Sequence, residues 1–147
     1  ARELFIPEKA VLIHNVDILS DLNLRQLIGF HQQNHYVATL VVRPSVPGRG
    51  LRFNEAGWLK GWENSCTGET KRVDAEFETA HNYSFCGIHI VSPELLKQMI
   101  HRGVFSIIDE YLAQARVRPL KMFFYDGFFL DLGTPEAIIQ AGKCLQV

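Results

Sequence analysis

The sequence contains few cysteines, and none of them has the spacing of a metal site. Cys66, Cys86 and Cys144 are the only three in 147 residues, and the lack of a C-x-x-C pair argues against a cysteine-based zinc centre. An odd number of widely separated cysteines is typical of reduced thiols, so we expect a cytoplasmic protein.

The chain also lacks a surplus of charge and a long hydrophobic run. Its 15 Lys and Arg residues nearly balance its 16 Asp and Glu residues, for a net charge of −1, whereas a general nucleic-acid binder carries a basic surplus. No run approaches the roughly 18 apolar residues of a membrane span, and no signal peptide is recognisable. We therefore expect neither nucleic-acid nor membrane partners, and the length predicts a single domain over residues 1–147.

Strand-like and helix-like segments alternate along the chain, which predicts an α/β fold. A continuous apolar run at residues 10–13, in a strand predicted at 10–16, fits a strand buried on both faces. Residues 36–42 predict a second strand, because Val37, Thr39, Val41 and Val42 favour a pleated surface. Apolar residues at helical spacing lie between the two predicted strands, and together they form a strand–helix–strand unit with an expected right-handed crossover. Because such units carry parallel strands, we predict a mixed, mostly parallel sheet flanked by helices. Ser20 or Asp21 is the expected N-cap of the first helix.

The rest of the chain predicts a hairpin, three further strands and three helices. Residues 51–54 and 58–62 flank a Glu55-Ala56-Gly57 turn and predict the hairpin, whereas the polar segment 64–82 predicts an irregular loop. Strands are expected at residues 84–91, 120–125 and 128–130. Helix-start signals at Ser92-Pro93 and Thr134-Pro135 predict helices that end near residues 103 and 145, and another helix is expected at 107–115.

Two acidic residues, Asp17 and Asp131, are the strongest candidates for a functional site. Each follows a predicted strand and precedes a turn and a helix start, and acids at the carboxyl ends of strands in an open α/β sheet can meet in one crevice. Such a pair suits a magnesium ion that carries phosphates, because Mg²⁺ is usually held by one or two carboxylates together with waters and substrate oxygens. A turn-forming Asp is the alternative at each position. Gly133, close to Asp131, favours close approach of a ligand.

Arginines and polar residues around the hairpin leave alternatives open. Arg43, Arg49 and Arg52 either face an anionic substrate or lie on the solvated surface. Glu63 and Asn64, at the end of the hairpin, either hydrogen-bond sugar hydroxyls or form a polar turn. Composition and spacing do not decide between these alternatives.

Two histidines lie four residues apart in the first predicted helix. His31 and His35 could share a helical face as a zinc pair would, but no third ligand is evident. His31 fits the apolar side of that helix, so we expect it to be a partly buried structural residue.

Several motifs resemble those of the sugar-phosphate nucleotidylyltransferases. Leu12-Ile13-His14-Asn15-Val16-Asp17 is similar to the central motif of that family, and residues 51–64 are similar to its sugar-facing hairpin. Residues 83–90 resemble its sugar-side strand, and Asp131-Leu132-Gly133-Thr134-Pro135-Glu136 completes a match in the family's order over nearly the whole chain. The subgroup most resembled includes mannose-1-phosphate guanylyltransferases and N-acetylmuramate-1-phosphate uridylyltransferases.

The resemblance implies a fold, a cofactor and a set of site residues. The implied fold is the Rossmann-like nucleotide-diphospho-sugar transferase fold. The implied catalytic residues are Asp17 and Asp131, which would hold Mg²⁺. The residues implied to bind the sugar phosphate are Asn15, Glu63, Asn64 and the backbone of Gly87.

One feature of the family is missing from these 147 residues. The glycine-rich loop, with the arginine and lysine that cradle the nucleoside triphosphate, is absent. We therefore expect a fold that is incomplete at its N-terminal side, in a C-terminal fragment of a larger domain. The strand at residues 10–16 would then have a free edge, which predicts pairing with another chain, as in a homodimer.

The resemblance implies that the parent protein is an enzyme, a sugar-1-phosphate nucleotidylyltransferase. Such an enzyme transfers a nucleoside monophosphate from a nucleoside triphosphate to a sugar 1-phosphate and releases pyrophosphate. We expect this chain alone to be inactive, because the phosphate-binding loop is missing. One alternative is a non-catalytic sugar-phosphate-binding or assembly module of the same fold. Another is a generic α/β nucleotide binder, in which the two acids have no particular pairing.

Overall fold

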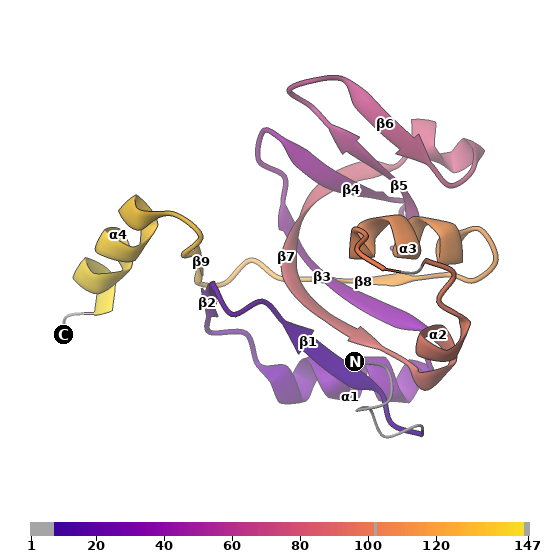
Figure 1. Ribbon diagram of the computed structural model, residues 1–147, viewed down its shortest axis with the longest axis horizontal. Coiled ribbons are helices and arrows are strands. Elements are labelled where there is room, and N and C mark those ends of the chain that lie inside the picture. Colours follow the sequence, from indigo (N-terminus) through magenta and orange to yellow (C-terminus); the bar gives the residue numbers. More distant parts are fainter. Residues whose placement is uncertain (1–7, 102, 146–147) are drawn as a thin grey trace.

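A computed structural model describes residues 8–101 and 103–145 of the chain. Its main sheet has seven strands, six of them in the order β6-β5-β4-β7-β3-β8, and β1 also pairs with β7 (Figure 1). These strands are β1 (Val11–His14), β3 (Ala38–Pro44), β4 (Arg49–Phe53), β5 (Leu59–Asn64), β6 (Glu69–Arg72), β7 (His81–Val91) and β8 (Lys121–Phe124). The predicted hairpin is β4–β5, and its strands are longer than the sequence indicated.

The long strand β7 lies at the centre of the main sheet. It pairs with β3 on one side, and on the other side with β4 near its start and with β1 near its end, each time antiparallel. Within the described residues, β3 and β8 form the only parallel pair. The prediction of a mostly parallel sheet is therefore wrong, because β7 inserts between β1 and β3, and these two strands are parallel without being neighbours.

Helices cover both faces of the main sheet. On β3, Leu40 and Val42 belong to one core with Tyr111 of α3 (Ile107–Ala115), whereas Val41 belongs to a second core with Leu27 of α1 (Leu24–Asn34). This division follows from the geometry of a strand, in which successive side chains point to opposite faces. Burial on both faces was predicted for residues 10–13, and there β1 is only partly buried, with Val11 and Ile13 packed against the first core and Leu12 against the second.

The segment at residues 64–82 contains regular structure, contrary to the predicted loop. It includes β6 and a short 3-10 helix at Ala75–Glu78. Phe77 of this helix is 3% exposed, and a Cβ on Gly61 would lie 2.3 Å from its ring, so the ring packs directly on the sheet. One buried aromatic residue thus anchors an otherwise polar segment. The helix after Ser92 is also shorter than expected, since α2 covers Pro93–Gln98.

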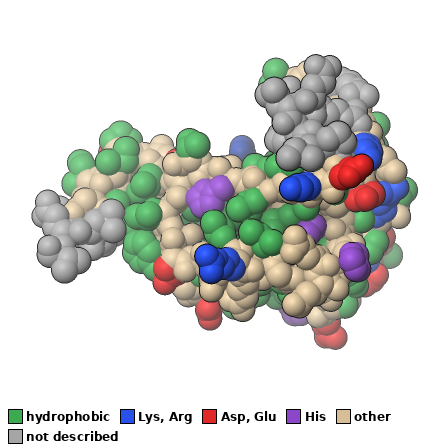
Figure 2. Space-filling model, turned by 90° about the horizontal axis from the view of Figure 1, so that it is seen from below, with side chains coloured by type: hydrophobic (Ala, Val, Ile, Leu, Met, Phe, Trp, Pro, Cys, Tyr) green, Lys and Arg blue, Asp and Glu red, His purple; other side chains and the backbone are tan. Residues whose placement is uncertain are grey.

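A second sheet of two strands carries the last helix. β2 (Ile18–Ser20) and β9 (Phe129–Asp131) pair antiparallel, and α4 (Pro135–Leu145) follows β9. Figure 1 shows α4 beyond this strand pair and away from the main sheet, and Figure 2 shows hydrophobic side chains at the same end of the molecule. Ile138 and Ile139 of α4 are 58% and 63% exposed.

Two features of the described structure concern the surface: the free edge of β1 and the character of the helices. Among the described strands, β1 pairs only with β7, so its other edge has no strand partner, and pairing with a second chain stays a prediction. None of the described helices has the length and apolar character needed to cross a membrane.

Candidate functional site

Asp17 and Asp131 are brought together by the pairing of β2 with β9. Ile18, next to Asp17, lies opposite Asp131 in this pairing, and the backbone N–H of Leu132 donates to the carbonyl of Asp17 at 2.7 Å. A Cβ placed on Gly133 would lie 3.0 Å from Oδ1 of Asp131 and 3.5 Å from Oδ2 of Asp17. The two carboxylates therefore face one point beside Gly133.

The reason for this convergence differs from the sequence argument. Asp17 does follow a strand of the main sheet, β1, but Asp131 ends β9, which belongs to the two-stranded sheet. The strand β2, which pairs with β9, is only three residues long and was not predicted. The register in which β2 pairs with β9, rather than a shared sheet edge, therefore determines how close the two acids lie.

The carboxylate pair fits the ligand set of a magnesium ion. Asp17 is half-buried and Asp131 is exposed, and within the described residues neither carboxylate forms an ion pair with a cation. The N–H of Gly133 donates to Oδ1 of Asp131 at 2.9 Å and orients it. No group of three or more His, Cys, Asp or Glu with metal-binding geometry occurs in the described ranges. A metal at this point would therefore depend on two carboxylates, which is usual for Mg²⁺.

A hydrogen-bond network, not anticipated from the sequence, positions the start of β9. Tyr125 donates to the carboxylate of Asp21 and to the carbonyl of Phe128, and the same carboxylate accepts the N–H of Phe128 at 3.0 Å. Burial and the hydrogen bond to Asp21 raise the pKa of Tyr125 to about 12, so the hydroxyl stays a donor. Asn23, rather than Ser20 or Asp21, caps α1 through its bond from the N–H of Gln26.

A cavity of about 520 Å³ lies between the main sheet and β9. It opens because β7 pairs with β4 at residues 81–83 and with β1 at residues 88–91, so that the stretch between them has no described strand beside it on that edge. Its lining residues are Asn15, Ile18, Arg43, Val46, Arg49, Gly50, Leu51, Trp62, Ser84, Phe85, Cys86, Gly87, Ile108, Phe129, Leu130 and Asp131.

Asn15 and Gly87 meet at one wall of this cavity. The backbone N–H of Asn15 donates to the carbonyl of Gly87 at 3.0 Å. Gly87 has a φ of 68°, and a Cβ there would lie 2.7 Å from Nδ2 of Asn15. Glycine is needed for both reasons, because other residues rarely adopt this backbone conformation and the Asn15 side chain occupies the space. The Asn15 amide is thereby held beside the cavity.

Cys86 also lines the cavity but lacks the properties of a nucleophile. Its side chain is 1% exposed, and burial raises the pKa of the thiol to about 12, although nearby Arg43 acts in the opposite direction. A thiol rather than a thiolate is therefore present at neutral pH, and the thiolate is the reactive form.

Glu63 and Asn64 are not among the residues that line this cavity. The Glu63 carboxylate forms an ion pair with Arg52 at 2.8 Å. The Asn64 side chain accepts the N–H of Cys66 at 3.1 Å in the turn between β5 and β6. Their positions opposite Gly50 and Arg49, which do line the cavity, leave both near its edge. A sugar contact from either residue stays a prediction.

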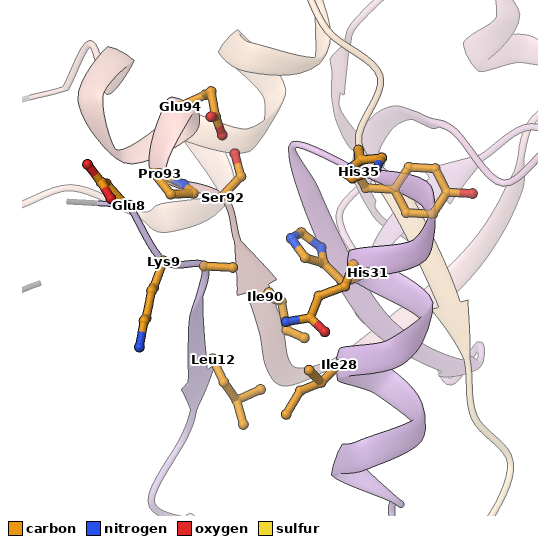
Figure 3. Close-up of a pocket in the computed structure, with 13 residues that line it drawn as sticks. Glu8, Lys9, Leu12, Ile28, His31, His35, Ile90, Ser92, Pro93 and Glu94 are labelled. Atoms are coloured by element: carbon orange, nitrogen blue, oxygen red, sulfur yellow. The ribbon is translucent and has the colours of Figure 1, made fainter. Parts of the chain in front are cut away.

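A second cavity, of about 670 Å³, lies beside α1 and does not contain the acidic pair. Figure 3 shows that His31 comes from α1, and His35 directly follows this helix, whereas Glu8 and Glu94 belong to other segments. His31 is 4% exposed and hydrogen-bonds the hydroxyl of Thr39 at 2.9 Å. Burial lowers the pKa of His31, with an opposing effect of Glu94. His31 is thus a structural residue, as predicted, and this larger cavity is the weaker candidate for chemistry.

Comparisons with known proteins agree with the motifs. No known protein-family model matches the chain. It is 26% identical over 135 residues to the mannose-1-phosphate guanylyltransferase catalytic subunit beta of Drosophila pseudoobscura pseudoobscura, a match covering 89% of this chain and 33% of that protein. It is 25% identical over 145 residues to a mannose-1-phosphate guanyltransferase of Emericella nidulans, covering 89% and 34%. The chain thus spans about one third of the length of these curated relatives.

Solved structures share its fold. HddC from Yersinia pseudotuberculosis, complexed with GMP-PN, gives a TM-score of 0.67 at 15% identity, covering 93% of this chain and 56% of that one. UDP-glucose pyrophosphorylase from Acinetobacter baumanii gives a TM-score of 0.68 at 12% identity, covering 91% and 50%. The predicted α/β, Rossmann-like fold and the similarity to sugar-phosphate nucleotidylyltransferases are confirmed.

Proposed function

We propose that this chain forms the sugar-phosphate-binding and metal-binding part of a sugar-1-phosphate nucleotidylyltransferase. One observation carries the proposal: Asp17 and Asp131 face a common point beside a cavity that Asn15 and Gly87 line. The similarity to proteins named mannose-1-phosphate guanylyltransferase supports it.

The proposed reaction joins a sugar 1-phosphate to a nucleoside monophosphate. An oxygen of the sugar phosphate attacks the α-phosphorus of a nucleoside triphosphate in line, the bond from that phosphorus to the bridging oxygen breaks, and pyrophosphate leaves. No covalent bond to the protein forms, so catalysis depends on positioning and on neutralising charge. The chain's contribution is therefore to hold the attacking phosphate and the metal in a defined relation.

Asp17 and Asp131 are the residues that would hold Mg²⁺ in this proposal. When bound, the ion would offset the negative charge that gathers at phosphorus. The hydrogen bond from the N–H of Leu132 fixes the main chain at Asp17, and the hydrogen bond from the N–H of Gly133 orients the carboxylate of Asp131.

Asn15 and Gly87 are proposed to bind the sugar. The Asn15 side chain offers a donor and an acceptor to sugar hydroxyls, and the absence of a side chain on Gly87 leaves the space that this amide occupies at the cavity wall. Glu63 and Asn64 would contribute only from the edge of the cavity, and Glu63 would first have to leave its ion pair with Arg52. The pairing of Glu63 makes its sugar contact the weakest part of the proposal.

Metal binding by the acidic pair can be measured with Mn²⁺ as a paramagnetic probe. Asp17→Asn and Asp131→Asn are each expected to weaken Mn²⁺ binding at least tenfold in water-proton relaxation titrations of the chain, with Mg²⁺ as competitor. Asp126→Asn removes the same charge from an exposed position that does not line the cavity, and this control should bind Mn²⁺ as the parent chain does. Equal Mn²⁺ binding by all four proteins would contradict the metal site.

Turnover distinguishes the enzyme from a binding module. These 147 residues contain no glycine-rich triphosphate loop, so we expect the chain alone to release little or no pyrophosphate from a nucleoside triphosphate and a sugar 1-phosphate. Supplying the loop-bearing half of such a domain as a second polypeptide should raise Mg²⁺-dependent turnover, and Asp17→Asn should abolish the gain. Binding of sugar phosphate that is independent of Mg²⁺ and of both acids would favour the non-catalytic module.

A further inference from the structure

Two arginines that line the 520 Å³ cavity have no carboxylate partner among the described residues. Arg43 lies near the end of β3 and is half-buried, and Arg49 is the first residue of β4 and is exposed. Other arginines nearby are neutralised: Arg52 pairs with Glu63 at 2.8 Å, and Arg72 pairs with Glu78. The charged residues that line the cavity are therefore two arginines and one carboxylate, Asp131, and no ion pair joins either arginine to that carboxylate among the described residues.

The guanidinium group of Arg43 is held in a defined position. Its central carbon lies 4.7 Å from the centroid of the Phe129 ring. This contact with the ring leaves the N–H donors of the group available, and none of them forms a hydrogen bond to another described residue. A partly buried cation without an opposite charge is unfavourable unless an anion binds to it. Planar guanidinium groups bind phosphate through two parallel hydrogen bonds.

The stacking also places Arg43 close to the acidic pair. Phe129 begins β9, and Asp131 ends the same three-residue strand and lines the same cavity. Arg43 thus connects the main sheet to the strand that carries one of the two proposed metal ligands. A phosphate held by Arg43 would lie between that arginine and a metal on the carboxylates, where both cations could contact it.

We propose that Arg43 and Arg49 bind the phosphate group of the substrate, so that the cavity selects sugar phosphates over neutral sugars. The inference rests on the proposed function and adds the residues that recognise the anion. Arg43 is the principal contact because Phe129 orients it, and Arg49 contributes from the start of β4 as an exposed charge. Mg²⁺ should strengthen phosphate binding, because without the metal the carboxylate of Asp131 repels the anion.

The test measures binding of mannose 1-phosphate and of mannose to the full 147-residue chain by calorimetry, with and without Mg²⁺. The parent should bind mannose 1-phosphate at least tenfold more tightly than mannose. Arg43→Gln should remove at least ten-fold in affinity for the phosphate and Arg49→Gln about three-fold, with little change for mannose. Arg25→Gln, which loses the same charge at an exposed position of α1 outside the cavity, should stay within two-fold of the parent.

Two further variants separate charge from packing. Phe129→Leu removes the stacking partner and keeps both arginines, and Arg43→Lys keeps the charge without the planar group. The proposal predicts that Phe129→Leu and Arg43→Lys lose less affinity than Arg43→Gln. Urea unfolding of each variant identifies any variant that does not fold. If Arg43→Gln does not fold, the affinity of Arg43→Lys is compared instead with that of the Arg25→Lys control, which also keeps its charge.

Each outcome bears on a different claim. Equal affinities of Arg43→Gln, Arg49→Gln and Arg25→Gln for mannose 1-phosphate would overturn the assignment and leave the proposed function in place. An equal loss of affinity for mannose and for mannose 1-phosphate in Arg43→Gln would also overturn it, because packing rather than charge would then carry binding. If the parent chain binds neither mannose 1-phosphate nor Mn²⁺, both the assignment and the proposed function are wrong.

Discussion

Replacing Gly87 by alanine tests how the wall of the cavity is built. The φ of 68° lies in the left-handed region, which costs a residue with a side chain about 1–2 kcal/mol. The new Cβ would also lie 2.7 Å from Nδ2 and 3.2 Å from Cβ of Asn15, so the Asn15 side chain has to move. Because the Asn15 backbone is bonded to Gly87 at 3.0 Å, that movement weakens a hydrogen bond worth about 1 kcal/mol.

The expected result is a loss of about 1–3 kcal/mol in the free energy of unfolding, since alanine also restricts the unfolded chain and offsets part of the cost. Urea unfolding followed by circular dichroism measures it, and the melting temperature should fall by about 2–4 °C per kcal/mol. Gly29→Ala is the matched control, because Gly29 lies within α1 with nothing within 4 Å of its added Cβ. That variant should gain about 0.5–1 kcal/mol. A Gly87→Ala variant as stable as the parent would refute the reasoning.

Two buried titratable residues give the remaining predictions. Burial lowers the pKa of His89 to about 4, and both ring nitrogens lack hydrogen-bond partners among the described residues. Below about pH 6.5 the unfolded chain binds a proton at His89 that the folded chain excludes, so the free energy of unfolding falls as the pH drops toward 4. His89→Phe should reduce this pH dependence, which urea titrations at several pH values measure. An unchanged pH dependence in the variant would contradict the prediction. Burial favours a raised pKa for Glu110, but bonds from His101, Gln114 and Ile100 outweigh it, and the pKa is lowered. The stability that Glu110 contributes is then present above its unfolded pKa of about 4.3 and is lost as the pH falls through its lowered folded value. At pH 7, Glu110→Gln should lower the free energy of unfolding by about 2–3 kcal/mol, because it leaves buried donors without acceptors. The exposed control Glu55→Gln should change that free energy little. Equal effects of the two substitutions would refute the role of Glu110.

The secondary structure could largely be predicted from the sequence, but the strand order could not. The strand at residues 36–42 was predicted from its β-branched residues, and in β3 Leu40 and Val41 face opposite cores. Burial on both faces says nothing about strand direction, however. The prediction of a mostly parallel sheet was wrong because β7, which begins at His81, inserts beside β3, which ends at Pro44. Long-range pairing of this kind leaves no local pattern in hydrophobicity.

The candidate site shows the same limit at a smaller scale. The turn-and-helix context indicated Asp17 and Asp131 as a pair, yet their approach depends on β2 and β9, which are three residues each and too short to produce a periodic signal. The contact of Arg43 with Phe129 was equally hidden, since nothing in either segment's sequence points to the other. Residue types predicted the chemistry of the site, whereas register and long-range packing determined its geometry.

The division of the site between two sheets has a consequence for function. The proposed sugar contacts, Asn15 and Gly87, are tied to the main sheet through the bond between them, whereas Asp131 belongs to the β2–β9 pair. The distance between the proposed sugar and metal subsites therefore depends on contacts that join the two sheets. The stacking of Arg43 on Phe129 and the bonds of Tyr125 to Asp21 and Phe128 are such contacts. If in-line transfer requires a defined distance between phosphate and metal, these residues act on the reaction through position even where they touch no substrate.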